Sequence, residues 1–225
     1  MHIEPGVVNG AKLALSYATA AGAGLYTLKL VWDNVRHSGL ASLAARSALT
    51  TGLVFTFFEV LPHFPVGVSE VHFILGSTLF LLFGAAPAAI GLVLGLFVQG
   101  FFLAPFDLPQ FGMNMTTLLV PLFALQALAN LIIAPNTVYV DLKYSQALAL
   151  STAYQGGVVL WVAFWAFYGQ GFGAENMTAV ASFGSAYMLV ILVEPLADLA
   201  FLAAAKSMKG LEKLGLFTPR LLNAA

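Results

Sequence analysis

The first two residues, Met1 and His2, form the pair best suited to binding a metal ion. The free α-amine of Met1, the deprotonated backbone nitrogen of His2 and the His2 imidazole can bind one ion through fused chelate rings. These nitrogens leave one position of a square plane open. Such tetragonal sites suit Ni(II) and Cu(II), admit Co(II), and fit Zn(II) or Mg(II) poorly. The competing interpretation is that a histidine occupies position two by chance, on a terminus that binds nothing tightly.

The composition restricts the other ligands. The chain has no cysteine, so a metal would be held by nitrogen or oxygen rather than by thiolate. The first residues have neither the positive start nor the apolar core of a cleavable signal, which predicts that Met1 begins the mature chain. Because His2 is bulky, we expect Met1 to escape removal by the aminopeptidase. Its α-amine is then available as a ligand.

The residues that would position this terminus are strongly apolar. The chain has 225 residues, 60% of them hydrophobic and 8% charged, and its mean hydropathy is +0.90, which is typical of a membrane protein with several spans. A membrane helix needs about 20 apolar residues, and the sequence predicts an all-α integral membrane protein with about seven such helices. Their expected ranges are Val7–Val31, Leu40–Leu61, Val71–Ala86, Pro87–Phe106, Met113–Ala134, Ser145–Tyr168 and Met177–Ala205.

The third and fourth predicted helices are short and almost contiguous, which favours a tight helical hairpin or a partly re-entrant pair. No second domain is indicated, so we expect residues 1–225 to form one transmembrane domain with an N-terminal chelating segment at residues 1–6. The net charge of −1 gives no reason to expect a nucleic acid partner.

The basic residues predict the orientation in the bilayer, because cytoplasmic loops are enriched in Lys and Arg. With the N-terminus outside and the C-terminus in the cytoplasm, the outer loops carry acidic residues, and Lys12 lies in the first turns of the first helix. The remaining eight of the nine basic residues are then cytoplasmic: Lys29, Arg36, Arg46, Lys143, Lys206, Lys209, Lys213 and Arg220. This orientation places Met1 and His2 on the extracytoplasmic side.

Two further histidines, His63 and His72, lie on the same predicted side, in or beside a segment with too many helix breakers to be helical. We expect this segment, residues 62–72, to be a structured outer loop, and either histidine could supply the fourth ligand. Histidines at a membrane boundary that only contact water are the common alternative. The fourth histidine, His37, follows Arg36 in a predicted cytoplasmic loop, where a solvated surface role is expected.

Several polar side chains could support such a site. Glu59 and His63 are four residues apart, so on a helix the carboxylate could orient the imidazole, or the pair could simply be solvated. Asn114 and Gln99 could hydrogen-bond the N-terminal segment or join neighbouring helices. Glu194 and Asp198 lie in the last predicted span, where buried carboxylates are costly, so we expect them to contact Lys or Arg or to form a coupling surface.

The chain resembles the CbiM/NikM family, the substrate-capture subunits of energy-coupling-factor importers for nickel and cobalt. One departure is that two residues, rather than one, separate Ser69 from His72. The segments that carry the resemblance are Met1-His2-Ile3 with the following acid and Gly6, the segment from Phe64 to His72, Gln99, Gly112-Met113-Asn114, and Tyr187 to Leu199 with Glu194.

The resemblance implies the ligand set and the function. The ion would be held by the Met1 amine, the backbone and imidazole nitrogens of His2, and His72, with His63 as the competitor for the fourth position. It implies a non-enzymatic subunit of an ABC importer in a bacterial or archaeal plasma (inner) membrane, with Ni²⁺ or Co²⁺ as cargo and no resident cofactor.

The expected partners are a transmembrane coupling protein and two cytoplasmic ATPases, with or without a small accessory membrane subunit. The chain has no phosphate loop ending in Gly-Lys-Ser or Gly-Lys-Thr, so ATP hydrolysis would occur in the partners. A metal sensor or a structural membrane subunit without transport of its own is the alternative, because capture without transport would use the same ligands.

Overall fold

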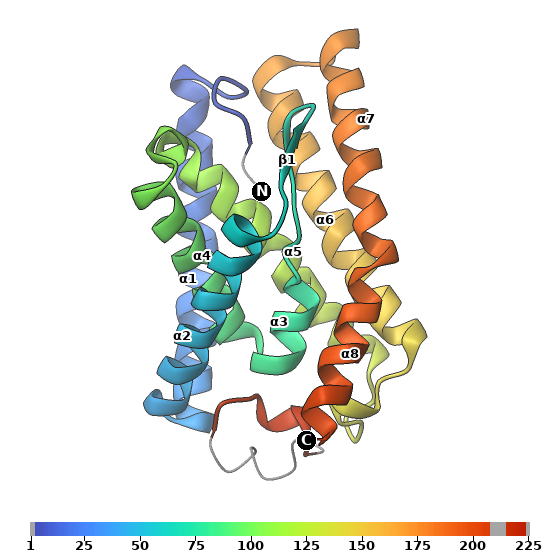
Figure 1. Ribbon diagram of the computed structural model, residues 1–225. Coiled ribbons are helices and arrows are strands. Elements are labelled where there is room, and N and C mark those ends of the chain that lie inside the picture. Colours follow the sequence, from blue (N-terminus) through green and yellow to red (C-terminus); the bar gives the residue numbers. More distant parts are fainter. Residues whose placement is uncertain (1–2, 208–214, 224–225) are drawn as a thin grey trace.

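The computed structural model describes residues 3–207 and 215–223, and its helices form a bundle (Figure 1). Two short strands and several short 3₁₀ and π segments connect or extend these helices. The α-helices are α1 (Leu13–Ser38), α2 (Leu40–Phe55), α3 (Gly76–Phe83), α4 (Ala85–Phe102), α5 (Phe111–Ile132), α6 (Tyr144–Gln170), α7 (Ala174–Met188) and α8 (Glu194–Ser207). The strands are β1 (Phe64–Val66) and β2 (Ser69–Val71).

An all-α membrane protein is confirmed. In the described part of the chain, five helical segments are long and apolar enough to cross a membrane: Leu40–Val60, Ala85–Phe102, Pro105–Ile132, Tyr144–Gln170 and Ala174–Ser207. They correspond to the second, fourth, fifth, sixth and seventh predicted helices. The 26 residues of α1 are about 39 Å long, but Ser, Thr, Tyr and Gly lower their apolarity. With α7 and α8 taken as one segment, the described residues form seven helical segments.

The third predicted span is wrong. Val71 ends β2, the chain then continues to Leu75 without helix, and α3 has 8 residues, which gives a length of about 12 Å. This is far short of a hydrocarbon layer of about 30 Å. All of α3 is buried inside the bundle, so its apolar residues pack against protein. Gly84, with φ of 88°, is the only residue between α3 and α4, which agrees with the predicted tight connection between these two helices. Whether the pair is re-entrant in a membrane stays a prediction.

The predicted outer loop is a β-hairpin. Strands β1 and β2 pair antiparallel, with Phe64 opposite Val71, and Gly67 takes a φ of +63° at the turn. Glycine adopts this conformation without steric cost. A Cβ atom at Gly67 would also lie 2.0 Å from the Ala179 carbonyl oxygen in α7. The turn therefore packs tightly against α7 because it has no side chain at this position.

The bundle has two ends, which hold different connecting segments (Figure 1). We call one the hairpin end, because it holds the hairpin, the 3₁₀ helix Pro105–Gln110 and the turn between α6 and α7. The opposite end holds the turns at Gly39 and Gly84, the 3₁₀ helix Tyr139–Asp141 and residues 215–223. Ile3 to Val8 belong to the hairpin end, so the described parts nearest the two termini lie at different ends of the molecule.

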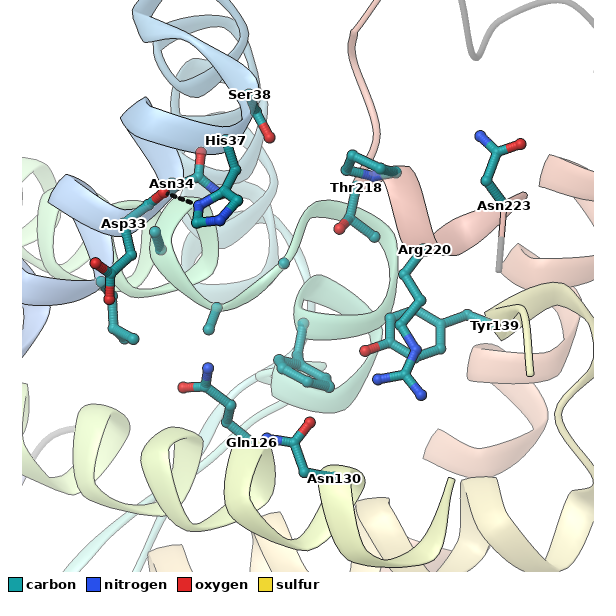
Figure 2. Close-up of a pocket in the computed structure, with 16 residues that line it drawn as sticks. Asp33, Asn34, His37, Ser38, Gln126, Asn130, Tyr139, Thr218, Arg220 and Asn223 are labelled. Carbon is teal, nitrogen blue, oxygen red and sulfur yellow. Dashed lines mark hydrogen bonds between the residues drawn. The ribbon is translucent and has the colours of Figure 1, made fainter. Parts of the chain in front are cut away.

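Residues 215–223 cover the opposite end. The Thr218 backbone N–H donates to the Leu82 carbonyl over 2.8 Å, and the Arg220 guanidinium lies 5.1 Å from the centre of the Tyr139 ring. Burial raises the pKa of the Tyr139 phenol, and the charge of Arg220 opposes that rise. Between this segment, α1 and α5 lies a polar cleft of about 410 Å³, shown in Figure 2.

His37 lines this cleft at the end of α1 (Figure 2). Its Nδ1 lies 2.6 Å from the Asp33 backbone carbonyl, and its side chain is exposed, as predicted for a surface residue. The cleft and His37 are therefore at the other end of the bundle from His63 and His72.

Candidate metal centre

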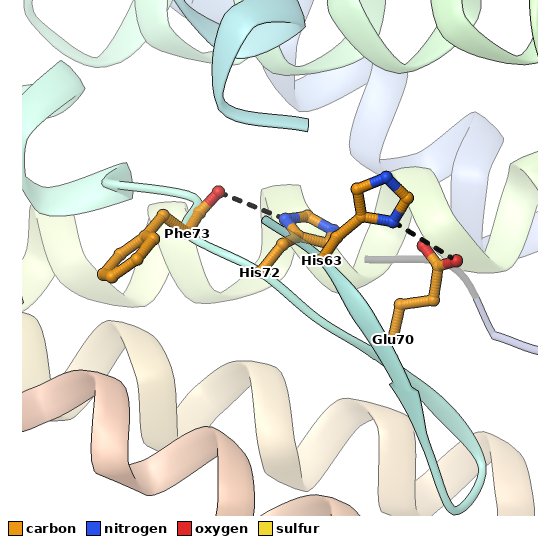
Figure 3. Close-up of polar contacts among 4 residues, drawn as sticks. All are labelled: His63, Glu70, His72 and Phe73. Carbon is orange, nitrogen blue, oxygen red and sulfur yellow. Dashed lines mark hydrogen bonds and ion pairs between the residues drawn. The ribbon is translucent and has the colours of Figure 1, made fainter. Parts of the chain in front are cut away.

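His72 is the buried histidine of the hairpin end. It follows β2 directly and its exposed fraction is 3%. Its Nδ1 lies 3.1 Å from the Phe73 carbonyl oxygen (Figure 3). A carbonyl can only accept, so Nδ1 carries the hydrogen and Nε2 has the lone pair. Histidines that ligate metals commonly make this contact, which fixes the ring and the tautomer. The Phe58 ring packs on the imidazole with centroids 4.6 Å apart and restricts the ring further.

The N-terminal segment is anchored beside the strand that leads to His72. Ile3 is fully buried and forms an antiparallel β-bridge with Ser69. The Ile3 N–H donates to Asn114 Oδ1 over 2.8 Å, and the Glu4 N–H donates to the Val68 carbonyl over 3.2 Å. Of the two roles open for Asn114, hydrogen bonding to the N-terminal segment is therefore the one observed.

Gln99, Met1 and His2 were also predicted to belong to the site or to support it. Gln99 is 4% exposed in α4, and its Oε1 has no hydrogen-bond partner in the described part of the chain, so a bond to the N-terminal segment is not observed there. Met1 and His2 lie outside the described residues, and their role as ligands stays a prediction.

His63 has a different acidic neighbour from the one predicted. The helix that contains Glu59 ends at Val60 and Leu61 is extended, so Glu59 and His63 do not share a helical face. Instead, His63 Nδ1 lies 3.8 Å from Glu70 Oε1 across the hairpin (Figure 3). The helical spacing was misleading because the breakers Pro62 and Pro65 end the helix first. Alternating apolar residues around Gly67 would have indicated a hairpin and hence this pair.

The hairpin also brings the two candidate ligands to one place. Because Phe64 pairs with Val71, His63 and His72 lie at the adjacent open ends of the two strands. Their environments differ, since the His63 side chain is 40% exposed whereas His72 is buried.

Negative charge gathers at this end of the bundle. The carboxylates of Glu4, Glu70 and Asp107 are close enough for their charges to interact. Burial raises the pKa of Glu4, and the neighbouring Glu70 carboxylate raises it further. Such a surface attracts cations before any ligand bond forms.

Glu194 and Asp198 do not form the expected contacts with Lys or Arg. Both are fully buried. Glu194 accepts hydrogen bonds from the Leu75 N–H at 2.9 Å and the Ser151 hydroxyl at 3.1 Å. Asp198 accepts from the hydroxyls of Ser77, at 2.9 Å, and Thr78. The described ion pairs lie elsewhere, at His63–Glu70 and Lys206–Asp141. These hydrogen bonds, rather than a cation, offset part of the cost of burial.

Known transporters share this architecture. Two crystal structures, described as a truncated transition metal transporter and a transition metal transporter, superimpose with TM-scores of 0.72 and 0.71. Each is 18% identical in sequence, so the likeness establishes the fold. The first match covers 92% of this chain and 99% of the other chain, and the second covers 95% and 97%. No curated protein sequence matches the chain significantly.

The sequence also matches a family model. The model is described as the cobalt uptake substrate-specific transmembrane region, CbiM, and it matches residues 2–210. That range is most of the chain and includes the hairpin, Asn114 and the whole helix bundle up to α8. The chain therefore belongs to the CbiM family, the substrate-specific transmembrane components of cobalt uptake systems.

Proposed function

We propose that this protein captures Ni²⁺ or Co²⁺ at the hairpin end, through the Met1 α-amine, the backbone and imidazole nitrogens of His2, and Nε2 of His72. The observation that carries the proposal is the anchoring of Ile3 by Ser69 and Asn114. Because the bridge to Ser69 is antiparallel and the Glu4 N–H bonds to the Val68 carbonyl, the backbone from Glu4 to Ile3 runs along β2 in the direction of His72, away from the hairpin turn.

Chain connectivity supports the same ligand set. Consecutive Cα atoms are about 3.8 Å apart, so a ligand role for Met1 and His2 requires a site close to Ile3, and Ile3 pairs with the strand that leads to His72. Within the described residues, no group of three or more His, Cys, Asp or Glu side chains could hold a metal ion by itself. In the proposed site, the N-terminus supplies nitrogen donors that suit Ni(II) and Co(II).

The distribution of basic residues supports an extracytoplasmic hairpin end. Lys12 lies near that end, whereas the other described basic residues lie in the half of the bundle toward the opposite end. Lys209 and Lys213 lie outside the described residues. Since cytoplasmic segments carry the excess of Lys and Arg, the ion would be collected outside, with the C-terminus in the cytoplasm. In this orientation we propose that α1 also spans the membrane.

The energy for uptake would come from partner proteins. The family consists of transport components, so this chain is not an enzyme. We propose that it acts with a transmembrane coupling protein and two cytoplasmic ATPases in a bacterial or archaeal plasma membrane, with or without a small accessory subunit. A sensor without transport would bind the ion equally well, and uptake into cells distinguishes the two functions.

The proposed ligands can be tested by substitution. His2→Ala, His72→Ala or one extra residue before Met1 should abolish uptake of nickel and cobalt in cells that express the whole transporter, because each change removes or displaces a nitrogen donor. The purified wild-type protein should bind Ni²⁺ and show the absorption of a square-planar complex, which these variants should lack.

Two other histidines serve as controls. His37→Ala changes the opposite end and should leave binding unchanged, whereas His63→Ala tests the competing fourth ligand and should also retain it. Full uptake by the chain with an extended N-terminus would refute the proposal. If His63→Ala loses the absorption of the square-planar Ni²⁺ complex and His72→Ala keeps it, the fourth ligand is His63 rather than His72.

A further inference from the structure

Leu75 has an unusual backbone conformation close to the proposed site. Its φ of 54° and ψ of 38° are left-handed, and it is the only residue other than glycine with positive φ in the described part of the chain. A branched L-residue adopts this conformation only when its surroundings hold it there. Leu75 lies three residues after His72 and immediately before α3. Its conformation therefore fixes how the chain leaves the hairpin end and enters the bundle.

The carboxylate of Glu194 holds this turn. Glu194 Oε1 accepts the Leu75 N–H over 2.9 Å, and Oε2 accepts the Ser151 hydroxyl from α6 over 3.1 Å. The next residue, Gly76, packs so closely on Tyr154 that a Cβ atom there would lie 2.2 Å from the ring. Leu75 and Gly76 are thus held between α6 and α8, and Glu194 satisfies the buried N–H of Leu75.

Pro195 explains why a carboxylate reaches this depth of the bundle. Proline lacks the N–H that would continue the helical hydrogen bonds, and its ring clashes with the carbonyl four residues earlier. The helix accordingly changes to 3₁₀ at Leu189–Leu192, and α8 begins at Glu194. This break places Glu194 at the start of a new helix, facing the end of the segment that carries His72.

We infer that Glu194 is a positioning residue for the metal site, which orients His72 by fixing Leu75. This inference rests on the proposed function. Glu194 is not one of the proposed ligands, and its two oxygens accept the Leu75 N–H and the Ser151 hydroxyl. Loss of its acceptor would release Leu75 toward an ordinary conformation and shift the backbone that orients His72. Removing such a supporting contact typically costs about 10- to 100-fold in metal affinity.

The test compares Glu194→Ala with Glu194→Gln in the full-length protein. We expect Glu194→Ala to lower the affinity for Ni²⁺ about 10- to 100-fold and to change the absorption of the bound ion. Glu194→Gln keeps an oxygen acceptor for the Leu75 N–H, so it should retain most of the affinity. Amide hydrogen exchange at Leu75, measured without metal, should be faster in Glu194→Ala than in the wild type or Glu194→Gln.

Asp198→Asn is the matched control. Asp198 is equally buried on α8 but contacts the Ser77 and Thr78 hydroxyls rather than a backbone N–H of the turn, so this variant should bind as the wild type does. Equal affinity losses in Glu194→Ala, Glu194→Gln and Asp198→Asn would overturn the inference, because they would indicate general destabilisation of α8. Wild-type affinity in a folded Glu194→Ala would also overturn it.

These outcomes are distinguishable from failure of the proposed function. If the wild-type protein binds neither Ni²⁺ nor Co²⁺, the metal site itself is refuted. If His72→Ala abolishes binding while Glu194→Ala leaves it unchanged, the metal site stands and the positioning role of Glu194 is refuted.

Discussion

Asn114 connects the N-terminal segment to the centre of the bundle. Its side chain is 1% exposed, and its Oδ1 accepts the Ile3 N–H. Ile3 in turn pairs with Ser69 on the strand that leads to His72. At the scale of single residues, the candidate site therefore depends on side chains that hold two backbone segments together, in addition to those expected to touch the ion.

Asn114→Ala should weaken metal binding. It leaves the buried Ile3 N–H without its acceptor, which typically costs about 1–3 kcal/mol and frees the segment that carries the predicted ligands. We expect about a 10- to 100-fold lower affinity for Ni²⁺ in titrations of the purified protein. Thr117→Ala is the control, because the buried Thr117 hydroxyl, on the same helix as Asn114, donates to the Met113 carbonyl of that helix over 2.8 Å. Similar losses in both variants would contradict a specific role for Asn114.

The hairpin is the element that assembles the hairpin end. Its two strands bring His63 beside Glu70, pair Ser69 with Ile3, and place His72 at the end of β2. The turn at Gly67 rests on the backbone of α7. The hairpin thus joins the N-terminal segment to the last helices of the chain, and its register decides which residues face the N-terminus.

Gly67→Ala should displace the hairpin. The left-handed conformation alone costs a residue with a Cβ about 1–2 kcal/mol, and the 2.0 Å approach to the Ala179 carbonyl oxygen adds a backbone clash. We expect a lower unfolding temperature together with reduced affinity for Ni²⁺.

Gly215→Ala is the matched control for this change. Gly215 has the same φ of +63°, but a Cβ atom there would meet Ser42 at an ordinary 3.4 Å, at the opposite end of the bundle. Gly215→Ala should lower the unfolding temperature, because of the left-handed conformation, without lowering the affinity for Ni²⁺. Unchanged metal affinity in Gly67→Ala would indicate that the hairpin does not position the site.

At the scale of the whole molecule, charge separates the two ends. Carboxylates of Glu4, Glu70 and Asp107 interact at the hairpin end. The opposite end buries the guanidinium of Arg46, which donates to the Phe83 carbonyl over 2.8 Å and to Asn34 over 2.9 Å. The acidic hairpin end suits a surface that attracts cations. The basic residues toward the opposite end suit a cytoplasmic side, where Lys and Arg are enriched.

The orientation can be measured by thiol labelling, because the chain has no cysteine of its own. Phe172 is 75% exposed at the hairpin end, between α6 and α7, and Asn223 is exposed at the opposite end. In intact cells, a membrane-impermeant maleimide should label Phe172→Cys and should label Asn223→Cys only after permeabilisation. The reverse pattern would place the hairpin end in the cytoplasm and contradict extracytoplasmic capture.

The sequence predicted the long apolar helices correctly, because they depend on local composition. Long apolar stretches such as Ala85–Phe102 and Tyr144–Gln170 are helical in any bilayer, because the backbone must satisfy its hydrogen bonds internally. The same reasoning failed for Val71–Ala86. An apolar stretch can be buried in protein as well as in lipid, so hydropathy alone could not distinguish the strand and the buried α3 from a spanning helix.

For the candidate site, the sequence predicted ligand types, whose role stays a prediction, but it did not predict the contacts that support them. The types and positions of Met1, His2 and His72 indicated nitrogen ligands, since chelation by an N-terminus is a local property of the chain. Only the tertiary structure decided that Asn114 holds Ile3 and that Glu194 holds Leu75, pairs separated by 111 and 119 residues. Such pairs follow from how the helices pack around α3, and the chemical types of the residues do not specify that packing by themselves.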